Sequence, residues 1–310
     1  MIPLRVGIIG YGKIAIDQHV PSIRGNARFE LVAASSPNTP IPPEIAGYTD
    51  HHAMLVKEQL DAVAVCTPPR VRFDIAHDCL DAGVHTLLEK PPGVTLGEVQ
   101  ALDAIAAAKG VTVFTTWHAQ YNDGVAAAAE LLAGKRVAAM KIVWKEDVRK
   151  WHPGQQWIWQ PGGFGVFDPG INALSIATRI FPGDLVLRTA TLFVPANRQA
   201  PIAAELSFSS DAADGPLTAL FDWRHSGDEA WTIGVETSDG KKLDLVEGGS
   251  RLIVDGTERK GPGVSEYAAI YARFVDLIDA RQSLVDIEPL RLTADAFLAG
   301  ARRPVEAFED

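Results

Sequence analysis

The chain has 310 residues, of which 47% are hydrophobic and 22% are charged, and its 39 acidic residues outnumber its 29 basic ones to give a formal net charge of −10. Because no run of basic residues stands apart from this negative balance, we expect neither nucleic acid nor an anionic membrane as a partner. The length favours two domains, each long enough to bury its own core.

The chain begins with a predicted strand and a glycine-rich turn. Leu4 to Ile9 is a short apolar run rich in β-branched residues, and the next six residues, from Gly10 to Ala15, read Gly-x-Gly-x-x-Ala. In this pattern the first glycine permits a tight turn, the second, Gly12, lets the backbone approach a pyrophosphate, and the small third residue lets the next helix pack on the strand. The pattern alone is weak, but its position between a strand and a helix predicts dinucleotide binding.

The end of the second predicted strand bears on the choice of dinucleotide. This strand runs from Phe29 to Ala34 and is followed by Ser35-Ser36-Pro37-Asn38. In dinucleotide folds an acidic residue near this point binds the ribose 2′-hydroxyl of NAD, whereas an arginine binds the 2′-phosphate of NADP. Neither residue type stands here. The serine hydroxyls can serve either cofactor, so the missing positive charge favours NAD only modestly.

Strand and helix patterns continue to alternate up to residue 118. Strands are expected at 62–66, 84–88 and 111–115, and helices at 49–59, 72–82 and 95–109, the last with Thr95 as N-cap and Gly110 at its end. Such alternation predicts a doubly wound parallel sheet. Thr67, Lys90 and His118 each follow a strand end, so we expect them to line one crevice at the carboxyl edge of that sheet.

Lys90 stands at the most informative of these strand ends. The segment from Val84 to Leu88 is mostly apolar and is followed at once by Glu89, Lys90 and two prolines. Because a residue before proline is biased away from helix, Lys90 should be extended just past a buried strand, where open α/β sheets bind ligands. On this stretch alone a solvated loop lysine is the alternative. We expect instead that Lys90 faces the reacting carbon of a substrate beside a nicotinamide.

The pattern changes in the second half of the chain. After a helix expected at 122–132 and a strand at 137–146, strands follow at short spacing from 187 to 260, with turn signals at Asp239-Gly240 and Asp255-Gly256, and helices are expected at 265–280 and 289–300. We therefore predict an α/β Rossmann-type domain at 1–118 and an α+β domain with a large, mostly antiparallel sheet at 119–310. One face of that sheet should pack on helices, which leaves the other free to meet a second copy of the chain in a homodimer.

A tryptophan-rich loop follows the first strand of this second half. Between Lys145 and Gly163 the chain carries three of its seven tryptophans, among Glu, Asp, His and Gln residues. Aromatic faces stack on the apolar face of a sugar ring, and carboxylates and amides bind its hydroxyls. The alternative is that the tryptophans are core and the charges are solvated. Several tryptophans in one glycine-bounded loop favour a binding site.

The next predicted helix opens at Asp168-Pro169. On spacing alone, the simplest interpretation is that Asp168 is the N-cap and Pro169 the first helical residue. Asn172 follows Asp168 by four residues, so both side chains are expected to project from one face at the start of this helix.

Together these motifs resemble those of the glucose–fructose oxidoreductase/inositol dehydrogenase/MocA-like family. The resemblance rests on Gly10-x-Gly12-x-x-Ala15, on Glu89-Lys90-Pro91 and on Gly162-Gly163-x4-Asp168-x-Gly170-x-Asn172. The tryptophan-rich run and Phe221-Asp222-Trp223-Arg224-His225 are similar to those of its bacterial D-galactose 1-dehydrogenases and L-arabinose 1-dehydrogenases. Many family members carry a catalytic histidine at the position of Asn172. The sugar 1-dehydrogenases share the asparagine, which favours the narrower assignment.

The resemblance implies oxidation of an aldopyranose, such as D-galactose or L-arabinose, at C1 to the aldonolactone, with NAD, or else NADP, as the cofactor. It implies a catalytic set of Lys90, Asp168 and Asn172, in which Asp168 accepts the proton directly or through Lys90. The implied cofactor contacts are Gly10, Gly12, Lys13, Ile14, Ser35, Ser36, Thr67, Pro68, Arg70, Glu89 and Lys90. The implied sugar contacts are Lys90, His118, Glu146, Trp151, His152, Asp168, Asn172 and Trp231. No metal ligand is expected.

Two other functions fit the same motifs. The broad family includes a regulator that binds ligands without doing chemistry, although the intact Glu89-Lys90-Pro91 and Asp168 favour an enzyme. It also includes NAD-dependent glycosidases, which regenerate their cofactor and release a free sugar. Reduced cofactor formed from galactose and NAD would distinguish the dehydrogenase from both.

The cysteines and the first residues indicate a compartment. Cys66 and Cys79 lie in strand-like and helix-like patterns without metal-ligand spacing, as expected for buried thiols in reducing surroundings. The chain starts with a strand rather than a secretory signal, and no apolar run is long enough to span a bilayer. The sequence therefore predicts a cytoplasmic protein without a membrane partner.

Overall fold

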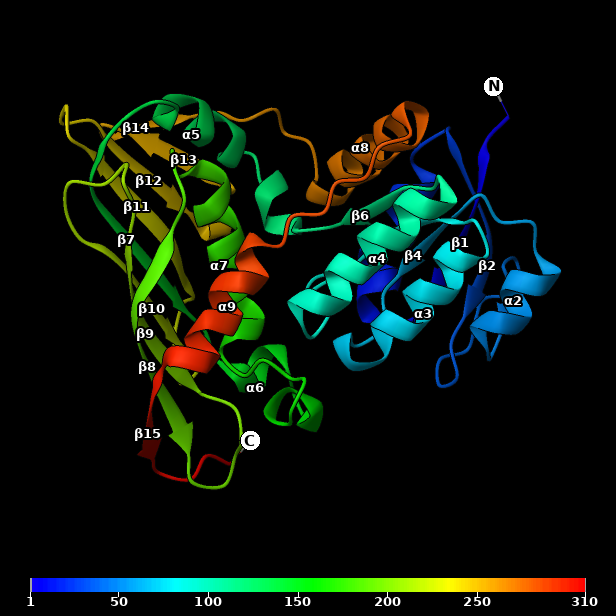
Figure 1. Ribbon diagram of the computed structural model, residues 1–310, viewed down its shortest axis with the longest axis horizontal. Coiled ribbons are helices and arrows are strands. Elements are labelled where there is room, and N and C mark those ends of the chain that lie inside the picture. The colour runs from blue at the N-terminus through cyan, green and yellow to red at the C-terminus, as the bar shows by residue number, and fades with distance from the viewer. Residues whose placement is uncertain (1, 310) are drawn as a thin grey trace. The chain divides into compact units, whose positions relative to one another are not determined.

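The computed structural model describes residues 2–309, which form two compact units (Figure 1). The first unit comprises the chain up to His118 together with Ser265–Ile287, and the second comprises Ala119–Val264 and the chain from Glu288 onward. The predicted domain at 119–310 is therefore not one piece, because residues 265–287 belong with the first unit. The aromatic side chain of Phe274 explains this, since it packs against Phe29 and Phe114 of the first unit.

The first unit is built on a parallel sheet of six strands. In spatial order they are β3 (Ala46–Tyr48), β2 (Phe29–Ser35), β1 (Leu4–Ile9), β4 (Ala62–Val65), β5 (His85–Leu88) and β6 (Val113–Thr115). Every pairing between them is parallel, as predicted. The strand order reverses between β1 and β4, so the crevice that such sheets offer to ligands lies at the carboxyl ends of these two strands.

Helices connect these strands and bury their apolar faces on the sheet. They are a π-helix (Ala15–His19), α1 (Val20–Arg24), α2 (His51–Lys57), α3 (Pro69–Asp81), α4 (Leu96–Lys109) and α8 (Glu266–Ala280). The expected caps of α4 are confirmed, since Thr95 forms a capping box with Glu98 and Gly110 ends the helix in the left-handed region. The helix expected at 49–59 is shorter, because the Asp50 side chain caps it by accepting a hydrogen bond from the backbone of Ala53.

The second unit is built on a mixed sheet of nine strands. In spatial order they are β14 (Thr257–Arg259), β13 (Arg251–Val254), β12 (Lys242–Val246), β11 (Ala230–Thr237), β7 (Val137–Lys145), β10 (Leu217–Asp222), β9 (Ala203–Ser209), β8 (Val186–Pro195) and β15 (Ala301–Val305). The pairings β7–β10 and β8–β15 are parallel and the others are antiparallel. The predicted large, mostly antiparallel sheet is confirmed.

Within residues 2–309, four α-helices belong to this second unit: α5 (Val125–Leu132), α6 (Val148–Trp151), α7 (Phe167–Ile180) and α9 (Glu288–Ala299). Short 3-10 turns lie at His118–Tyr121, Gln156–Trp159 and Glu247–Gly249. Helix α7 contacts β7 and β11, lies between α5 and α9 and is largely buried, so it is the central helix against the sheet (Figure 1). Pairing of the sheet with a second copy of the chain stays a prediction.

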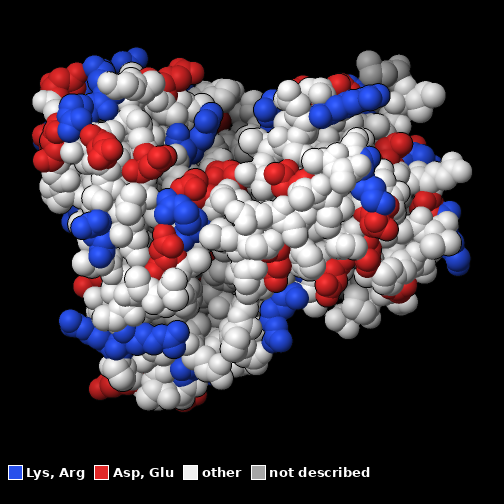
Figure 2. All heavy atoms as spheres, viewed as in Figure 1, with Lys and Arg blue, Asp and Glu red and all other residues white. Residues whose placement is uncertain are grey.

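The surface and the thiols add three further observations. No helix within residues 2–309 combines the length and the apolar character needed to cross a membrane. On the face that Figure 2 presents, basic and acidic side chains are interspersed. Cys79 is buried as expected. Cys66, which follows β4 at the carboxyl edge of the sheet, is only partly buried.

Candidate active site

The glycine turn after β1 has the backbone that its sequence pattern predicts. Gly10 has a φ of 90°, and a Cβ there would lie 2.9 Å from the backbone carbon of Cys66, so both the conformation and the space require glycine. At Gly12 a Cβ would meet nothing within 4 Å, so this side of the turn is open, and Ala15 is fully buried. The turn therefore fits a pyrophosphate approaching Gly12 at the start of the helix.

Side chains around this turn differ in what they offer a dinucleotide. Lys13 and Ile14 are exposed, and the Lys13 ammonium forms an ion pair with Asp17. At the end of β2, Ser35 is buried, and the hydroxyl of Ser36 accepts hydrogen bonds from the backbone of the following loop. Ser36 therefore shapes that loop, and its contact with a ribose stays a prediction.

The end of β4 supplies an unused hydroxyl beside the glycine turn. Thr67 Oγ1 is buried and, within the described part of the chain, has no hydrogen-bond partner. Its methyl group lies 3.0 Å from the position that a Cβ of Gly10 would take. A buried hydroxyl without a protein partner suits a hydrogen bond to a ligand. Pro68 and Arg70, the other expected contacts here, are exposed.

Glu89 is held by protein groups. Its side chain is buried, and Oε1 accepts a hydrogen bond of 2.7 Å from the Tyr267 hydroxyl and lies 3.0 Å from Nε2 of His19. The other oxygen, Oε2, accepts a bond of 2.9 Å from the backbone N–H of Lys90. Burial opposes the charged form, but hydrogen bonds from His19 and Tyr267 outweigh it and lower the pKa of Glu89 to about 2. Glu89 thus fixes the backbone of Lys90 beside it, and its expected contact with the cofactor stays a prediction.

Lys90 follows β5 directly and is partly buried. Arg72 on α3 fixes the backbone on both sides of Lys90, because its guanidinium donates hydrogen bonds to the carbonyl oxygens of Glu89 and Pro91. It also donates to the carbonyl oxygen of Thr67. Arg72 could not be identified from the sequence, since its acceptors are backbone atoms that only the fold brings together. The backbone around Lys90 is thus anchored from two directions.

His118 has an acidic neighbour in the same unit. Its Nδ1 lies 2.6 Å from Oε2 of Glu266, at the start of α8, and its ring stacks on Tyr267 at 5.9 Å. The side chain is partly buried. With Nδ1 engaged, Nε2 is the ring nitrogen that can serve as the expected sugar contact.

In the second unit, Asp168 lies beside an imidazole. Nε2 of His152 is 3.3 Å from Oδ2 of Asp168, and both side chains are largely buried. Asp168 was expected to be the N-cap of its helix, and this is wrong. The chain already turns at Gly165, whose carbonyl accepts a bond of 2.8 Å from the backbone of Asp168, so α7 begins at Phe167. The carboxylate is therefore directed to His152 instead of to a helix end.

Asn172 lies one turn further along α7. Its side-chain oxygen Oδ1 is buried and has no hydrogen-bond partner among residues 2–309. An unpartnered buried acceptor is costly unless a ligand or water supplies the donor. Its position four residues after Asp168 places both on one face of the helix, as expected.

The remaining expected sugar contacts are linked by direct contacts around Glu146. This buried carboxylate follows β7 and accepts hydrogen bonds of 3.2 Å from the indole of Trp223 and 2.8 Å from that of Trp231. The ring of Trp231 lies 5.7 Å from that of Trp151, which is 45% exposed, and the ring of Trp223 lies 5.3 Å from that of His152. Trp223 was not among the expected site residues, although it connects Glu146 to His152.

The tryptophans of the loop do not share one role. Trp159 is only 3% exposed and packs on Trp223 and Phe308, with ring centres 5.4 and 5.9 Å apart. For Trp159 the core interpretation therefore holds. Trp151, by contrast, is 45% exposed beside Trp231, with the Lys150 ammonium 4.9 Å from the centre of its ring. An indole with an exposed part beside a second indole suits a sugar platform.

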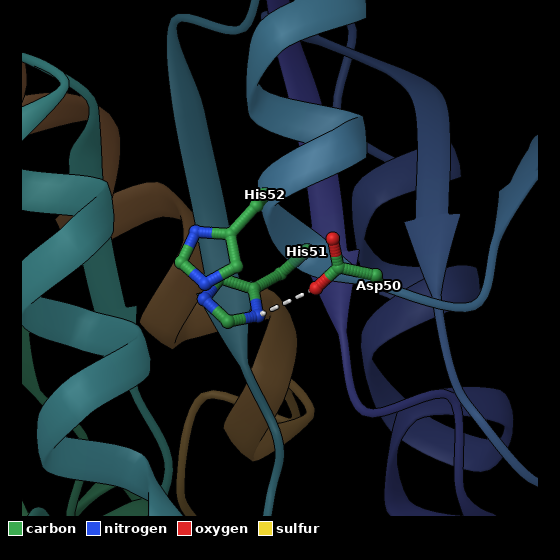
Figure 3. Close-up of side chains that lie close together, drawn as sticks. All are labelled: Asp50, His51 and His52. Carbon is green, nitrogen blue, oxygen red and sulfur yellow. Dashed lines mark ion pairs between the residues drawn. The ribbon is translucent and has the colours of Figure 1, made fainter.

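A separate group of imidazole and carboxylate side chains lies at the start of α2 (Figure 3). Asp50, His51 and His52 present ligand-type atoms within 4.8 Å of one another. Nδ1 of His51 is 3.7 Å from Asp50, and its Nε2 is 2.9 Å from Asp78. Both ring nitrogens of His51 thus face carboxylates, and ion pairs within the protein account for the cluster.

Comparison with known proteins identifies the family. Residues 4–117 match the GFO/IDH/MocA model, described as an oxidoreductase family with an NAD-binding Rossmann fold. Over the full length of both chains, the protein is 44% identical to the galactose 1-dehydrogenase of Pseudomonas fluorescens. The chain belongs to this family.

Solved structures of relatives agree with that assignment. The D-galactose-1-dehydrogenase protein of Rhizobium etli superimposes with a TM-score of 0.94 at 47% identity, covering 100% of this chain and 99% of the other. A 3-ketoreductase from Actinomadura kijaniata in complex with NADP and TDP-benzene gives a TM-score of 0.86 at 17% identity, over 98% and 100% of the two chains, and supports the fold alone. As a GFO/IDH/MocA member, the chain is an oxidoreductase with an NAD-binding Rossmann unit, as the resemblance implied.

Proposed function

We propose that the protein oxidises an aldopyranose at C1 to the aldonolactone, with D-galactose and L-arabinose as the first candidates and NAD or NADP as the oxidant. The observation that carries the proposal is the contact series in the second unit, from the exposed Trp151 through Trp231, Glu146, Trp223 and His152 to Asp168. A pyranose has an apolar C–H face and a rim of hydroxyls, which an indole face next to polar groups suits. The galactose dehydrogenase relatives support the same substrate class.

Oxidation at C1 removes a hydride from the carbon and a proton from its hydroxyl group. A hydride leaves C1, for which the bound nicotinamide supplies the acceptor, and a proton leaves the C1 hydroxyl. We assign Asp168 as the acceptor of that proton, directly or through Lys90, and Lys90 as the cation that polarises the hydroxyl. Asn172, whose amide cannot act as a base, would hold the hydroxyl through its unpartnered Oδ1. His152, 3.3 Å from Asp168, stands where it can take the proton onward.

The cofactor contacts proposed for this chain come from the first unit. Gly12 has open space for the pyrophosphate, and Thr67 Oγ1, which is buried without a hydrogen-bond partner among residues 2–309, would bond to the ligand. Ser35 and Ser36 supply neither the acid that selects NAD nor an arginine that selects NADP. We therefore expect turnover with both dinucleotides and a modest preference for NAD.

Initial rates with a panel of aldoses, each with NAD and with NADP, test the proposal. Lys90→Ala and Asp168→Asn should fold and bind the dinucleotide, yet lose turnover by about 10² to 10⁴-fold. Lys109→Ala and Asp239→Asn are matched controls, because each removes a charge from a surface ion pair in the same unit as its counterpart, and both should keep wild-type rates. Near-normal turnover in both site variants would refute the assignment of roles. Binding of sugar and dinucleotide without any reduced cofactor would indicate a regulator or a glycosidase instead.

A further inference from the structure

A fully buried imidazole connects three elements of the first unit. His19 ends the π-helix that starts just after the glycine turn, and its side chain has no solvent exposure. Its Nε2 lies 3.0 Å from Oε1 of Glu89, and its Nδ1 lies 2.8 Å from the hydroxyl of Tyr271 on α8. Both ring nitrogens are thus engaged with oxygen atoms from distant parts of the chain.

The groups around His19 favour its charged form. Burial alone would lower the pKa of His19, but Cys66 on the β4 side, Tyr271 and the hydrogen bond to Glu89 together raise it well above its usual value. Tyr267 on α8 donates its hydroxyl proton to Glu89, His118 also lowers the pKa of Glu89 through its charge, and Glu266 on α8 pairs with His118. Nε2 of His19 and Oε1 of Glu89 lie at the distance of an ion pair, both side chains are buried, and their oxygens and nitrogens have partners, which is the condition under which a buried ion pair is tolerated.

The ion pair reaches Lys90 through the second oxygen of Glu89. Oε2 accepts the backbone N–H of Lys90 at 2.9 Å, while Oε1 faces His19 and Tyr267. A continuous path of polar contacts thus runs from the helix of the glycine turn, through His19 and Glu89, to the backbone of Lys90. Because these contacts are buried, water cannot take the place of a side chain removed from them unless the surrounding residues move.

We propose that His19 is a positioning residue that couples the dinucleotide-binding turn to Lys90. Its imidazolium holds the Glu89 carboxylate, and this carboxylate holds the backbone of Lys90 at the end of β5. The inference rests on the proposed function in so far as Lys90 acts on the sugar. Loss of the imidazolium should therefore weaken dinucleotide binding and misplace Lys90, while leaving sugar contacts in the second unit unchanged.

Two amide substitutions separate the two nitrogens of His19. The side-chain amide of His19→Gln can still donate to Glu89 in place of Nε2, whereas that of His19→Asn reaches only the position of Nδ1, toward Tyr271. We expect kcat to fall about tenfold in His19→Gln and further in His19→Asn, with the sugar KM within about twofold of wild type and dinucleotide Kd raised in the same order. His51→Gln is the matched control, since it also removes an imidazole that pairs with a carboxylate at 2.9 Å in this unit, and it should change neither constant.

A double-mutant cycle with Glu89→Gln tests the charge coupling. The single variants each leave one buried charge without its partner, whereas the double variant replaces the ion pair by two amides that can bond each other. The double variant should therefore have a dinucleotide Kd and a kcat closer to wild type than Glu89→Gln alone. Strict additivity of the two changes would overturn the proposed coupling.

The protonation of His19 can be measured in the wild type, so the test does not depend on any variant folding. In ¹⁵N-histidine-labelled protein, both ring nitrogens of His19 should carry protons at pH 7.5. A neutral ring would overturn the proposal, and so would folded His19→Gln that melts earlier but keeps wild-type Kd and kcat, since that pattern marks a purely structural role. Dinucleotide Kd and the ¹⁵N signal need no sugar, so failure of the wild type to oxidise any aldose would sink the proposed function and leave these two results interpretable.

Discussion

In the second unit, Nε2 of His152 lies 3.3 Å from Oδ2 of Asp168. The histidine ends the short helix α6, in the tryptophan-rich loop, and the aspartate belongs to the first turn of α7. Helix α7 itself carries no histidine, and Asn172 stands four residues after Asp168. The imidazole next to the proposed proton acceptor is thus supplied by a loop.

Replacing His152 should separate sugar binding from proton transfer. His152→Gln keeps a donor toward Asp168 but cannot take up a proton, so we expect kcat to fall about 10 to 100-fold with little change in sugar KM. His152→Ala should lose kcat similarly and raise KM as well. His225→Gln, which alters a partly buried histidine bonded to the backbone of Asp228, serves as control. Steady-state kinetics decide, and wild-type kcat in His152→Gln would contradict the role.

Replacing Asn172 should lower activity much more than stability. Its buried Oδ1 lacks a partner, and a buried polar atom left unsatisfied costs roughly 1–3 kcal/mol. Asn172→Ala relieves this cost but also loses the packing of the amide, so it should unfold in urea at nearly the wild-type midpoint while its sugar turnover falls steeply. Asn197→Ala should show the reverse, because Asn197 makes surface hydrogen bonds to Phe308 and Glu309 that stabilise the chain end without touching the proposed site. A marked loss of stability in Asn172→Ala would show that the amide is a structural residue.

Glu146 should matter for both folding and sugar affinity. Two indole N–H groups converge on its carboxylate, so in Glu146→Gln the amide NH₂ must face one of these donors. We expect the free energy of unfolding to fall by about 1–3 kcal/mol and the sugar KM to rise as Trp231 loosens. Adding Trp231→Phe removes the conflicting donor, so the double variant should lose less stability than the sum of the singles. Full additivity in urea unfolding would argue against the shared carboxylate.

The two glycines of the turn should fail in different ways. Gly10→Ala forces a φ of 90° on alanine and places its Cβ 2.9 Å from backbone atoms, so it should destabilise the fold by roughly 1–3 kcal/mol. Gly12→Val meets open space within the protein and should fold normally. It should weaken dinucleotide binding by about tenfold or more, or about 1.4 kcal/mol. Thermal unfolding and fluorescence titration distinguish the two, and unchanged binding in Gly12→Val would place the pyrophosphate elsewhere.

The His19–Glu89 pair should make the free energy of unfolding fall both at high pH, through His19, and at low pH, through Glu89. The pKa of His19 is raised in the folded state, so its contribution is complete below 6.5 and is lost as pH rises toward the folded pKa, with a slope of about 1.4 kcal/mol per pH unit. The pKa of Glu89 is lowered, so its contribution is present above 4.5 and is lost as pH falls toward about 2. Urea unfolding above pH 6.5 should therefore be less pH-dependent in His19→Gln than in wild type. Parallel curves would show that His19 does not hold an extra proton.

Local patterns predicted the parts of the site that neighbouring residues build. The turn at Gly10 and Gly12 and the strand before Lys90 depend on residues adjacent in the chain, and both were located from the sequence. The bond from Tyr267 to Glu89 spans 178 positions and the pair of His19 with Glu89 spans 70, so no spacing rule could indicate them. The contact of Glu89 with the cofactor, which the resemblance implies, stays a prediction.

The errors in the second unit have local physical causes. Asp168 followed by proline has the composition of a helix cap, but the chain turns three residues earlier at Gly165, where a Cβ would lie 2.4 Å from the carbonyl oxygen of Pro201. That close approach starts the helix early and moves Asp168 inside it. The tryptophans of the loop looked equivalent in the sequence, yet packing against Trp223 and Phe308 separates the buried Trp159 from the exposed Trp151.

Because residues 265–287 belong to the first unit, this unit can complete its fold only after most of the second unit has been synthesised. Helix α8 delivers Phe274 to the core beside Phe29 and Phe114, and the segment after it pairs with β6 through Leu284. While the ribosome is still translating the second unit, Phe274 and Leu284 have not yet been made. The apolar surface around Phe29 and Phe114 therefore stays exposed to water during that time. A fragment ending at residue 118 should accordingly be a poor expression product, prone to capture by chaperones.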